Sequence, residues 1–397
     1  MSKKHIYTIL LALSVLPLKC FAQNNDSLGV DLIDIVRKVI GNSKPRELDS
    51  NPANYEPHIS VFPAVGYTLQ SGLAGILSSN VLFKLHQDTI TNKSFLLTNI
   101  TYTQYKQFIL PIESYIWTKN NNYNISTDWR YMKYPQYTYG IGGNTLPSNG
   151  YHIDYSLIRF HQTVLRKIVS KFYAGIGFNF DHYWNINEVD IPSTTVTDFK
   201  KYGLSNTATA SGPSINFLFD NRDNPINATK GSYAKLVYIK YLTALGSDAD
   251  WQSLSVDLRH YFKFSSHSNN TLALWAYAWA TTYGSTPYVM LPSTGWDPFN
   301  NTGRGYIQGR FRSNSLLYTE AEYRFGITNN QLLGGVIYGN LQTVSEPNTH
   351  KFVYVKPAVG FGLRVKLNKY SRTNIAIDYA FGAYGSKGLW VNLGEVF

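Results

Sequence analysis

The chain contains almost no cysteine: Cys20 is the only one in 397 residues. It lies in a segment, residues 1–22, that has the features of a secretory signal peptide: two early lysines, an apolar core and small residues before the cleavage site. The apolar core of about 10 residues is too short to span a bilayer. Lys19 disfavours the alternative of a lipidated Cys20, because a small residue is expected there. Cleavage after residue 22 excludes disulfides and thiolate chemistry from the mature chain.

Long hydrophobic runs are also missing, since no mature segment approaches the ~18 consecutive apolar residues of a membrane helix. Acidic residues are outnumbered, and the formal charge of +11 falls to +8 when the three lysines of the signal peptide are removed. The remaining Lys and Arg residues are scattered singly, which favours solvated positions over a nucleic-acid surface. Tyr is abundant instead, with 31 residues. Such a side chain suits the boundary between an apolar wall and a wet headgroup layer.

Motifs of catalysis and metal binding are absent from the sequence. There is no G-x-S-x-G serine elbow and no H-E-x-x-H, and the histidines are dispersed without the spacing of metal ligands. The glycines of 303–309 are spaced one residue too widely for a dinucleotide-binding loop. We therefore expect no enzyme activity, no cofactor and no metal site.

One amphipathic helix is predicted over residues 26–41. Leu28, Leu32, Ile35 and Val39 recur at helical spacing, and Asp26 with Ser27 can cap its start. Residues 42–56 form a polar, Pro-containing linker, so that 23–56 is a helix-and-linker region. Its apolar stripe needs a partner, and we expect residues 28–39 either to plug one mouth of the following domain or to lie on a membrane surface.

From residue 57 onward the hydrophobic period changes to two. In 252–264 the apolar Leu254, Val256 and Leu258 alternate with polar residues, and 316–325 repeats this pattern. Sixteen strands are predicted, at about 57–68, 72–85, 92–104, 107–118, 122–133, 151–166, 170–185, 203–219, 230–243, 250–264, 270–284, 314–326, 331–344, 352–367, 371–383 and 388–397.

The connections between these strands favour a membrane barrel over a soluble sandwich. Brief turns alternate with longer loops, which include 134–150, 186–202 and 285–313. An open sheet edge in hydrocarbon would leave backbone groups unpaired, so the first strand must pair with the last. The fold predicted for 57–397 is an all-β, sixteen-stranded antiparallel transmembrane β-barrel, preceded by a short N-terminal helix.

Two polar segments carry a family resemblance. The first is a turn with Asp220, Arg222, Asp223 and Pro225, in which Gly231 gives the backbone freedom. The second is the Gly- and Arg-rich loop that runs from Gly303 to Arg312. In this order and at this distance they resemble the barrel of the BamA/TamA outer-membrane assembly family, which includes the bacterial surface antigens. Residues 23–56 show no repeat of about 75 residues, so the resemblance is to a short form without POTRA domains.

The resemblance implies that an outside loop folds back into the lumen, where an arginine meets acidic groups of the wall. The matching tip here is Arg304-Gly305-Tyr306, with a planar guanidinium suited to a bidentate carboxylate contact. Glu322 matches the acidic wall residue and is the expected principal partner. Asn340 stands where relatives often place an aspartate, and Asp378 is a possible substitute for that charge.

The last strand carries a terminal aromatic. Leu389, Val391, Leu393 and Phe397 are expected on one alternating face, interrupted by Glu395. This ending resembles the C-terminal signal by which outer-membrane barrels are recognised for insertion.

The resemblance implies a barrel in the outer membrane of a Gram-negative bacterium, with both termini periplasmic and with lipid and lipopolysaccharide around it. The function expected is assistance in inserting or translocating proteins or lipids. The seam between the first and last strands would open, and glycines such as Gly66 and Gly388 lie near it, although glycine is equally a residue of barrel bends. The alternative is a passive pore or a scaffold that holds a periplasmic or lipoprotein partner at the N-terminal helix.

Overall fold

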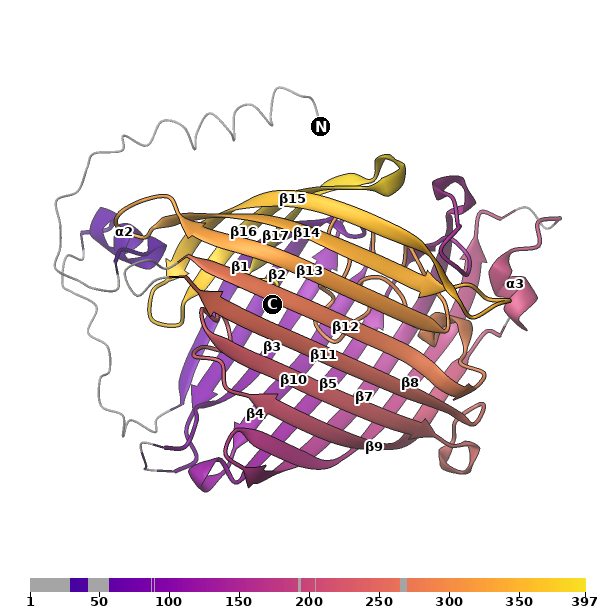
Figure 1. Ribbon diagram of the computed structural model, residues 1–397, viewed down its shortest axis with the longest axis horizontal. Helices are drawn as coiled ribbons and strands as arrows, with labels where there is room; N and C mark the ends of the chain where they lie inside the picture. Colours follow the sequence, from indigo (N-terminus) through magenta and orange to yellow (C-terminus); the bar gives the residue numbers. More distant parts are fainter. Residues whose placement is uncertain are drawn as a thin grey trace.

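The computed structural model describes residues 29–41, 57–86, 88, 90–191, 194–203, 205–264 and 270–397. The predicted signal peptide, the whole predicted linker 42–56, and Asp26, Ser27 and Leu28 lie outside these residues. Within them the chain forms one closed antiparallel sheet that wraps into a barrel, with a short helix at each end (Figure 1).

The strands are β1 His58–Thr68, β2 Gly72–Phe83, β3 Ser94–Thr103, β4 Phe108–Trp117, β5 Tyr123–Lys133, β6 Gln136–Thr138, β7 Tyr151–Val169, β8 Phe172–Val189, β9 Ala208–Asp220, β10 Gly231–Tyr241, β11 Trp251–Lys263, β12 Thr271–Gly284, β13 Ser315–Gly326, β14 Leu333–Ser345, β15 Phe352–Asn368, β16 Thr373–Gly382 and β17 Lys387–Leu393. The helices are α2 Leu32–Val39 and α3 Asp198–Gly203, with 3-10 turns η1 Lys119–Asn121, η2 Pro147–Asn149, η3 Thr243–Leu245, η4 Tyr288–Met290 and η5 Ala383–Gly385.

The seventeen strands make sixteen crossings, because β5 and β6 belong to one crossing and both pair with β7. Tyr134 and Pro135 separate them, and a proline has no N–H with which to continue the ladder. The barrel closes where β17 meets β1. The predicted all-β, sixteen-stranded antiparallel barrel is confirmed, and the sequence pattern missed only the short segment β6.

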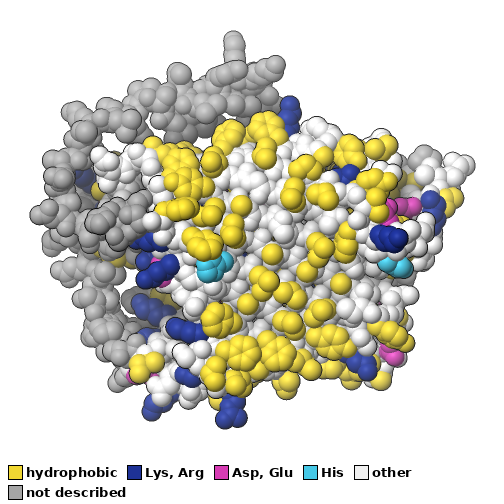
Figure 2. Space-filling model, in the orientation of Figure 1, with side chains coloured by type: hydrophobic (Ala, Val, Ile, Leu, Met, Phe, Trp, Pro, Cys, Tyr) yellow, Lys and Arg dark blue, Asp and Glu magenta, His cyan; other side chains and the backbone are white. Residues whose placement is uncertain are grey.

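The alternation along the strands places polar groups inside and apolar groups outside. On β11, Asp257 and Arg259 are each 7% exposed, whereas Leu258 is 47% exposed. The same inversion holds on β13, where Glu322 is fully buried and Leu317 is exposed. Figure 2 shows hydrophobic side chains spread over the outer face, with the charged ones toward the two ends of the barrel. A soluble sandwich has the opposite pattern, so the apolar faces of these strands point outward and the polar faces line a lumen.

The two ends of the barrel differ. We call the end that carries α2 and the start of β1 the terminal rim; the connections there are mostly short. The opposite end, the loop rim, carries residues 134–150, the described residues of 190–207, and 285–314, together with α3 (Figure 1). No helix among the described residues is long and apolar enough to cross a membrane.

The N-terminal helix is shorter than predicted. It begins at Leu32, because Asp31 and Asp34 form a reciprocal capping box in which the Asp34 N–H donates to Asp31 over 2.8 Å. Gly29 precedes it with φ +74° and packs against the carbonyl of Asn330, a backbone conformation that does not continue a helix. The expected start at residue 26 is therefore wrong.

Helix α2 is held at the terminal rim by polar contacts. The Lys369 N–H donates to Asp31 over 2.8 Å, and the Lys369 ammonium lies 3.1 Å from Asp34. The Val30 N–H donates to the carbonyl of Asn330 over 2.9 Å. The helix thus rests on the turns after β13 and β15. Its apolar residues Leu32, Ile33 and Ile35 are half-buried, whereas Val36 and Val39 remain exposed.

Candidate functional site in the barrel lumen

The loop between β12 and β13, residues 285–314, crosses the lumen. On one side Arg130 of β5 donates to the carbonyl of Pro298 over 2.9 Å. On the other side Arg304 reaches the walls formed by β13 and β16. The loop therefore touches strands from opposite parts of the barrel.

The tip of this loop is seated by its glycine and its tyrosine. Gly305 has φ +103°, and a Cβ built there would lie 2.7 Å from the Cβ of Ala358 on β15, so any side chain would push the tip off the wall. The Tyr306 hydroxyl donates to the carbonyl of Pro357 over 2.6 Å and accepts from the Ala383 N–H over 2.8 Å. These contacts fix the depth at which Arg304 enters the lumen.

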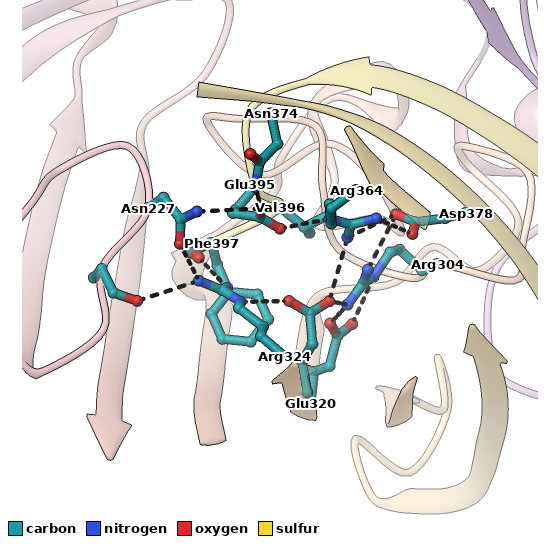
Figure 3. A network of polar contacts seen from close by, with 12 residues as sticks. Asn227, Arg304, Glu320, Arg324, Arg364, Asn374, Asp378, Glu395, Val396 and Phe397 are labelled. Atoms are coloured by element: carbon teal, nitrogen blue, oxygen red, sulfur yellow. Dashed lines mark hydrogen bonds and ion pairs between the residues drawn. The ribbon is translucent and has the colours of Figure 1, made fainter. Parts of the chain in front are cut away.

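The Arg304 guanidinium meets three carboxylates. It hydrogen-bonds Glu320 through both Nε and Nη2, lies 2.5 Å from Glu322, and lies 3.3 Å from Asp378 (Figure 3). Its carbon Cζ lies 3.5 Å from the ring centroid of Tyr338, so the cation also stacks on an aromatic face. The side chain is 4% exposed. We call this set the Arg304 clasp.

The carboxylates around Arg304 differ in whether they also pair with a second arginine. Glu322 also lies 2.7 Å from Arg324, and Asp378 lies 2.6 Å from Arg364. Among the described residues, Glu320 is within ion-pair distance of Arg304 alone and accepts a further hydrogen bond from Tyr318. Glu322 was expected to be the principal partner of Arg304. In the structure three carboxylates share Arg304, and Glu320 is the one that pairs with no other described arginine.

Asn340 takes part as a neutral donor. Its amide donates to the backbone carbonyl of Arg304 over 2.9 Å, while its Oδ1 has no hydrogen-bond partner among the residues described. It holds the tip of the loop and does not pair with the guanidinium.

The C-terminal tail enters the same network, which the sequence pattern did not predict. Gly394, with φ +91°, ends β17, so the expected strand to residue 397 stops at Leu393. Glu395 then pairs with Arg364 at 2.7 Å, and Arg324 donates to the Phe397 carbonyl over 2.6 Å (Figure 3). The Phe397 ring packs on Trp275 with centroids 5.2 Å apart. The prediction that Phe397 lies on one alternating strand face with Leu389 is wrong, because a positive φ at Gly394 turns the tail into the lumen.

The predicted turn motif lies at the terminal rim beside this tail. Arg222 pairs with Asp220 at 2.8 Å and donates to the carbonyl of Pro225 over 3.4 Å. Asp223 accepts hydrogen bonds from Thr229 and pairs with Arg372 at 2.6 Å.

Gly231 follows the turn with φ +105°, and a Cβ there would meet the Asn221 carbonyl at 2.5 Å. Asn227, within the turn, contacts Glu395 of the tail at 3.5 Å and Arg324 at 3.4 Å. The turn thus contacts the C-terminal tail, and no contact between it and Arg304 is found among the described residues.

The seam between β1 and β17 is much shorter than its neighbours. One register pair, Tyr67 with Val391, joins the two strands. By contrast β1 and β2 are paired over all eleven residues of β1, and β16 and β17 over seven pairs. The length of β17 does not account for this difference, since all seven of its residues pair with β16.

Solved structures share this fold. BamA from Haemophilus ducreyi lacking POTRA domains 1–3 superposes with a TM-score of 0.59 at 13% identity, over 86% of this chain and 70% of that one. CdiB from Escherichia coli gives 0.53 at 9% identity over 92% and 74%. CdiB from Acinetobacter baumannii gives 0.51 at 10% over 86% and 66%. No protein-family model and no curated protein matches the sequence. The chain therefore has the barrel fold of BamA and CdiB, and the likeness lies in the fold.

Proposed function

We propose that this chain is an outer-membrane barrel that assists the insertion or translocation of proteins or lipids by opening the seam between β1 and β17. The observation that carries the proposal is the single register pair at this seam. Backbone groups left unpaired in hydrocarbon cost several kcal/mol each, so a seam with few pairs is the place where an incoming strand or a lipid would gain most by binding.

The orientation proposed places the terminal rim in the periplasm. The long connections all lie at the opposite rim, which is the arrangement of bacterial outer-membrane barrels. Helix α2 would then face the periplasm, and the loop 285–314 would enter the lumen from outside.

A cysteine lock tests the seam. Tyr67→Cys with Val391→Cys should form a disulfide across β1 and β17, and Leu236→Cys with Val256→Cys is the matched control across the fully paired β10 and β11. Both pairs are introduced into a chain whose Cys20 has been replaced. The purified barrels are reconstituted in liposomes. Two rates are measured: insertion of a urea-unfolded outer-membrane barrel, and movement of a fluorescent lipid between leaflets.

The expected result is that at least one rate exceeds that of empty liposomes, falls in the oxidised seam lock, and recovers on reduction. The control lock should leave the rate unchanged. If the unlocked barrel accelerates neither process, or if the locked seam works as well as the reduced one, opening of the seam is refuted.

The exposed face of α2 favours a second candidate, a scaffold for a periplasmic partner. Val36, Val39 and Ile40 are 51%, 80% and 72% exposed although the helix itself is held to the rim. Crosslinking from a photoreactive residue at Val39 in the native envelope should then yield one defined adduct, whereas adducts with lipid alone would favour a membrane-surface role.

A further inference from the structure

A second internal feature lies apart from the Arg304 clasp. A cavity of about 180 Å³ is lined by strands β4, β5 and β7 to β12 and by residues 289–299 of the crossing loop, whereas the clasp rests on β13 to β16. The loop segment Pro298–Phe299 faces this cavity, and Arg130 holds its backbone.

One wall of the cavity carries a ladder of charged groups. Arg130 pairs with Asp128 at 2.5 Å, and Arg159 pairs with Asp181 at 2.6 Å. These side chains come from neighbouring positions on β5, β7 and β8, where Arg130 is opposite Arg159 and Arg159 is opposite Asp181. The ladder still presents polar edges to the cavity, since the side chains of Glu113 and Asp128 are 26% and 25% exposed.

Aromatic rings form much of the remaining lining. Tyr241 and Trp251 stack with centroids 4.0 Å apart, and Tyr277 and Trp279 extend this surface along β12. The loop adds Trp296 and Phe299. Phe299 is 41% exposed although it faces the interior of the barrel. The lining of the cavity therefore combines aromatic ring faces with the charged, hydrogen-bonding side chains of β4, β5, β7 and β8.

Several polar groups of this lining have unused bonding capacity. The ammonium group of Lys235 on β10 makes no hydrogen bond or ion pair with any residue that the structure describes. Asn179 Oδ1 and Trp251 Nε1 are buried and have no hydrogen-bond partner within the described ranges. The Lys235 ammonium can therefore donate to a ligand in the cavity, whereas neighbouring atoms cover the two buried atoms, so a ligand in the cavity does not reach them.

We propose that this cavity binds a single sugar ring. A pyranose has apolar C–H faces that pack on aromatic rings and a rim of hydroxyls that both donate and accept, which matches the two kinds of wall. The cavity is larger than the roughly 150 Å³ that accommodates benzene, and it is open on one side, so a ring with more atoms than benzene can enter it. The charged lining residues balance, with Glu113, Asp128 and Asp181 against Arg130, Arg159 and Lys235, which favours a neutral sugar over an ion. This site does not depend on opening of the seam.

The test uses the full mature chain in lauryldimethylamine oxide, a detergent without a sugar headgroup. Saturation-transfer NMR is recorded with methyl β-glucoside, methyl α-mannoside and N-acetylglucosamine while the aromatic protons of the protein are irradiated. Binding in the cavity should transfer saturation to the C–H protons of at least one of these sugars. This measurement needs no variant and therefore no assumption about folding.

Variants then locate the site. Phe299→Ser and Lys235→Gln should each weaken binding at least tenfold. Lys240→Gln, an exposed lysine on the same strand, and Tyr283→Ser, an exposed aromatic at the loop rim, should change it less than twofold. Unheated gel mobility verifies that each variant is folded.

Two results overturn the proposal: no saturation transfer to any of the three sugars, or transfer that persists unchanged in both cavity variants. Transfer that Phe299→Ser and Lys235→Gln abolish supports it. Titration with lipopolysaccharide in mixed micelles and with its delipidated oligosaccharide then distinguishes a sugar presented by a lipid from a free one.

Discussion

Removal of the Arg304 guanidinium should destabilise the barrel mainly through Glu320. In Arg304→Ala, Glu322 keeps Arg324 at 2.7 Å and Asp378 keeps Arg364 at 2.6 Å. Glu320, which is 4% exposed, retains only the hydroxyl of Tyr318. Breaking a buried pair and leaving one charge uncompensated typically costs ~3–5 kcal/mol, and we expect Arg304→Ala to fall in this range.

The second variant removes the orphaned charge. Glu320→Gln keeps the shape of the side chain and a hydrogen-bonding carbonyl, so the double variant with Arg304→Ala no longer buries an unpaired carboxylate at this position. The two losses should therefore be subadditive by about 2–3 kcal/mol, the upper part of the range for residues in one network. Arg304→Lys should fall between wild type and Arg304→Ala, since an ammonium keeps the charge without the planar fork.

A parallel cycle with Glu322 distinguishes the two carboxylates. Glu322→Ala also removes the partner of Arg324, so much of its cost is independent of Arg304. The coupling between Arg304 and Glu322 should therefore be smaller than that between Arg304 and Glu320. This ranking differs from the one that sequence alone suggests.

The assay is urea unfolding in detergent micelles, followed by tryptophan fluorescence and by unheated gel mobility. Arg166→Ala, an exposed arginine on β7, is the control and should change the free energy of unfolding by no more than about 0.5 kcal/mol. Strict additivity of Arg304→Ala and Glu320→Gln would refute the reasoning, because it would mean that the two groups do not interact in the folded barrel.

Three further predictions follow from the terminal rim. Phe397→Ala should lower the free energy of unfolding by about 3–5 kcal/mol in the same urea assay, because the ring is 5% exposed and packs on Trp275; a loss below about 1 kcal/mol would place the tail outside the lumen. Burial alone would raise the pKa of Asp223, but hydrogen bonds from Arg372 and Thr229 lower it to about 2. Since this folded-state pKa lies below the unfolded value of about 3.9, the contribution of Asp223 to stability is present above about pH 4 and is lost as the pH falls through about 2. Asp223→Asn should reduce that part of the acid sensitivity, whereas equal losses on acidification in both proteins would contradict the assignment. Asp31→Ala should accelerate amide hydrogen exchange in residues 32–39, because it removes the helix cap and the contact with Lys369; unchanged exchange would mean that the capping box does not hold the helix.

The sequence by itself determined the barrel and its sixteen crossings. Alternation with period two is a local property, and it was clear in segments such as 252–264 because each wall residue faces either apolar surroundings or a wet lumen. The Arg304 loop was also predicted, because its resemblance to the BamA/TamA family implies a re-entrant loop and its glycines permit a tight tip. The start of helix α2 was not, since Asp26 with Ser27 and Asp31 are all suitable caps in the sequence, and only the structure shows that Asp31 and Asp34 form a capping box.

Only the tertiary structure decided which side chains meet. Glu320 and Glu322 lie two residues apart on the same face of β13, so alternation makes them equivalent. Which of the two pairs more exclusively with Arg304 depends on how deeply the loop tip enters the lumen. The contacts of Gly305 with Ala358 and of Tyr306 with Pro357 fix that depth.

The C-terminal tail gives the same lesson. Pattern alone continues the last strand to Phe397, but the strand ends at Leu393. After Gly394 the tail turns into the lumen, where Arg324 and Arg364 hold it. Those arginines lie on β13 and β15, so their position cannot be predicted from the sequence of residues 388–397.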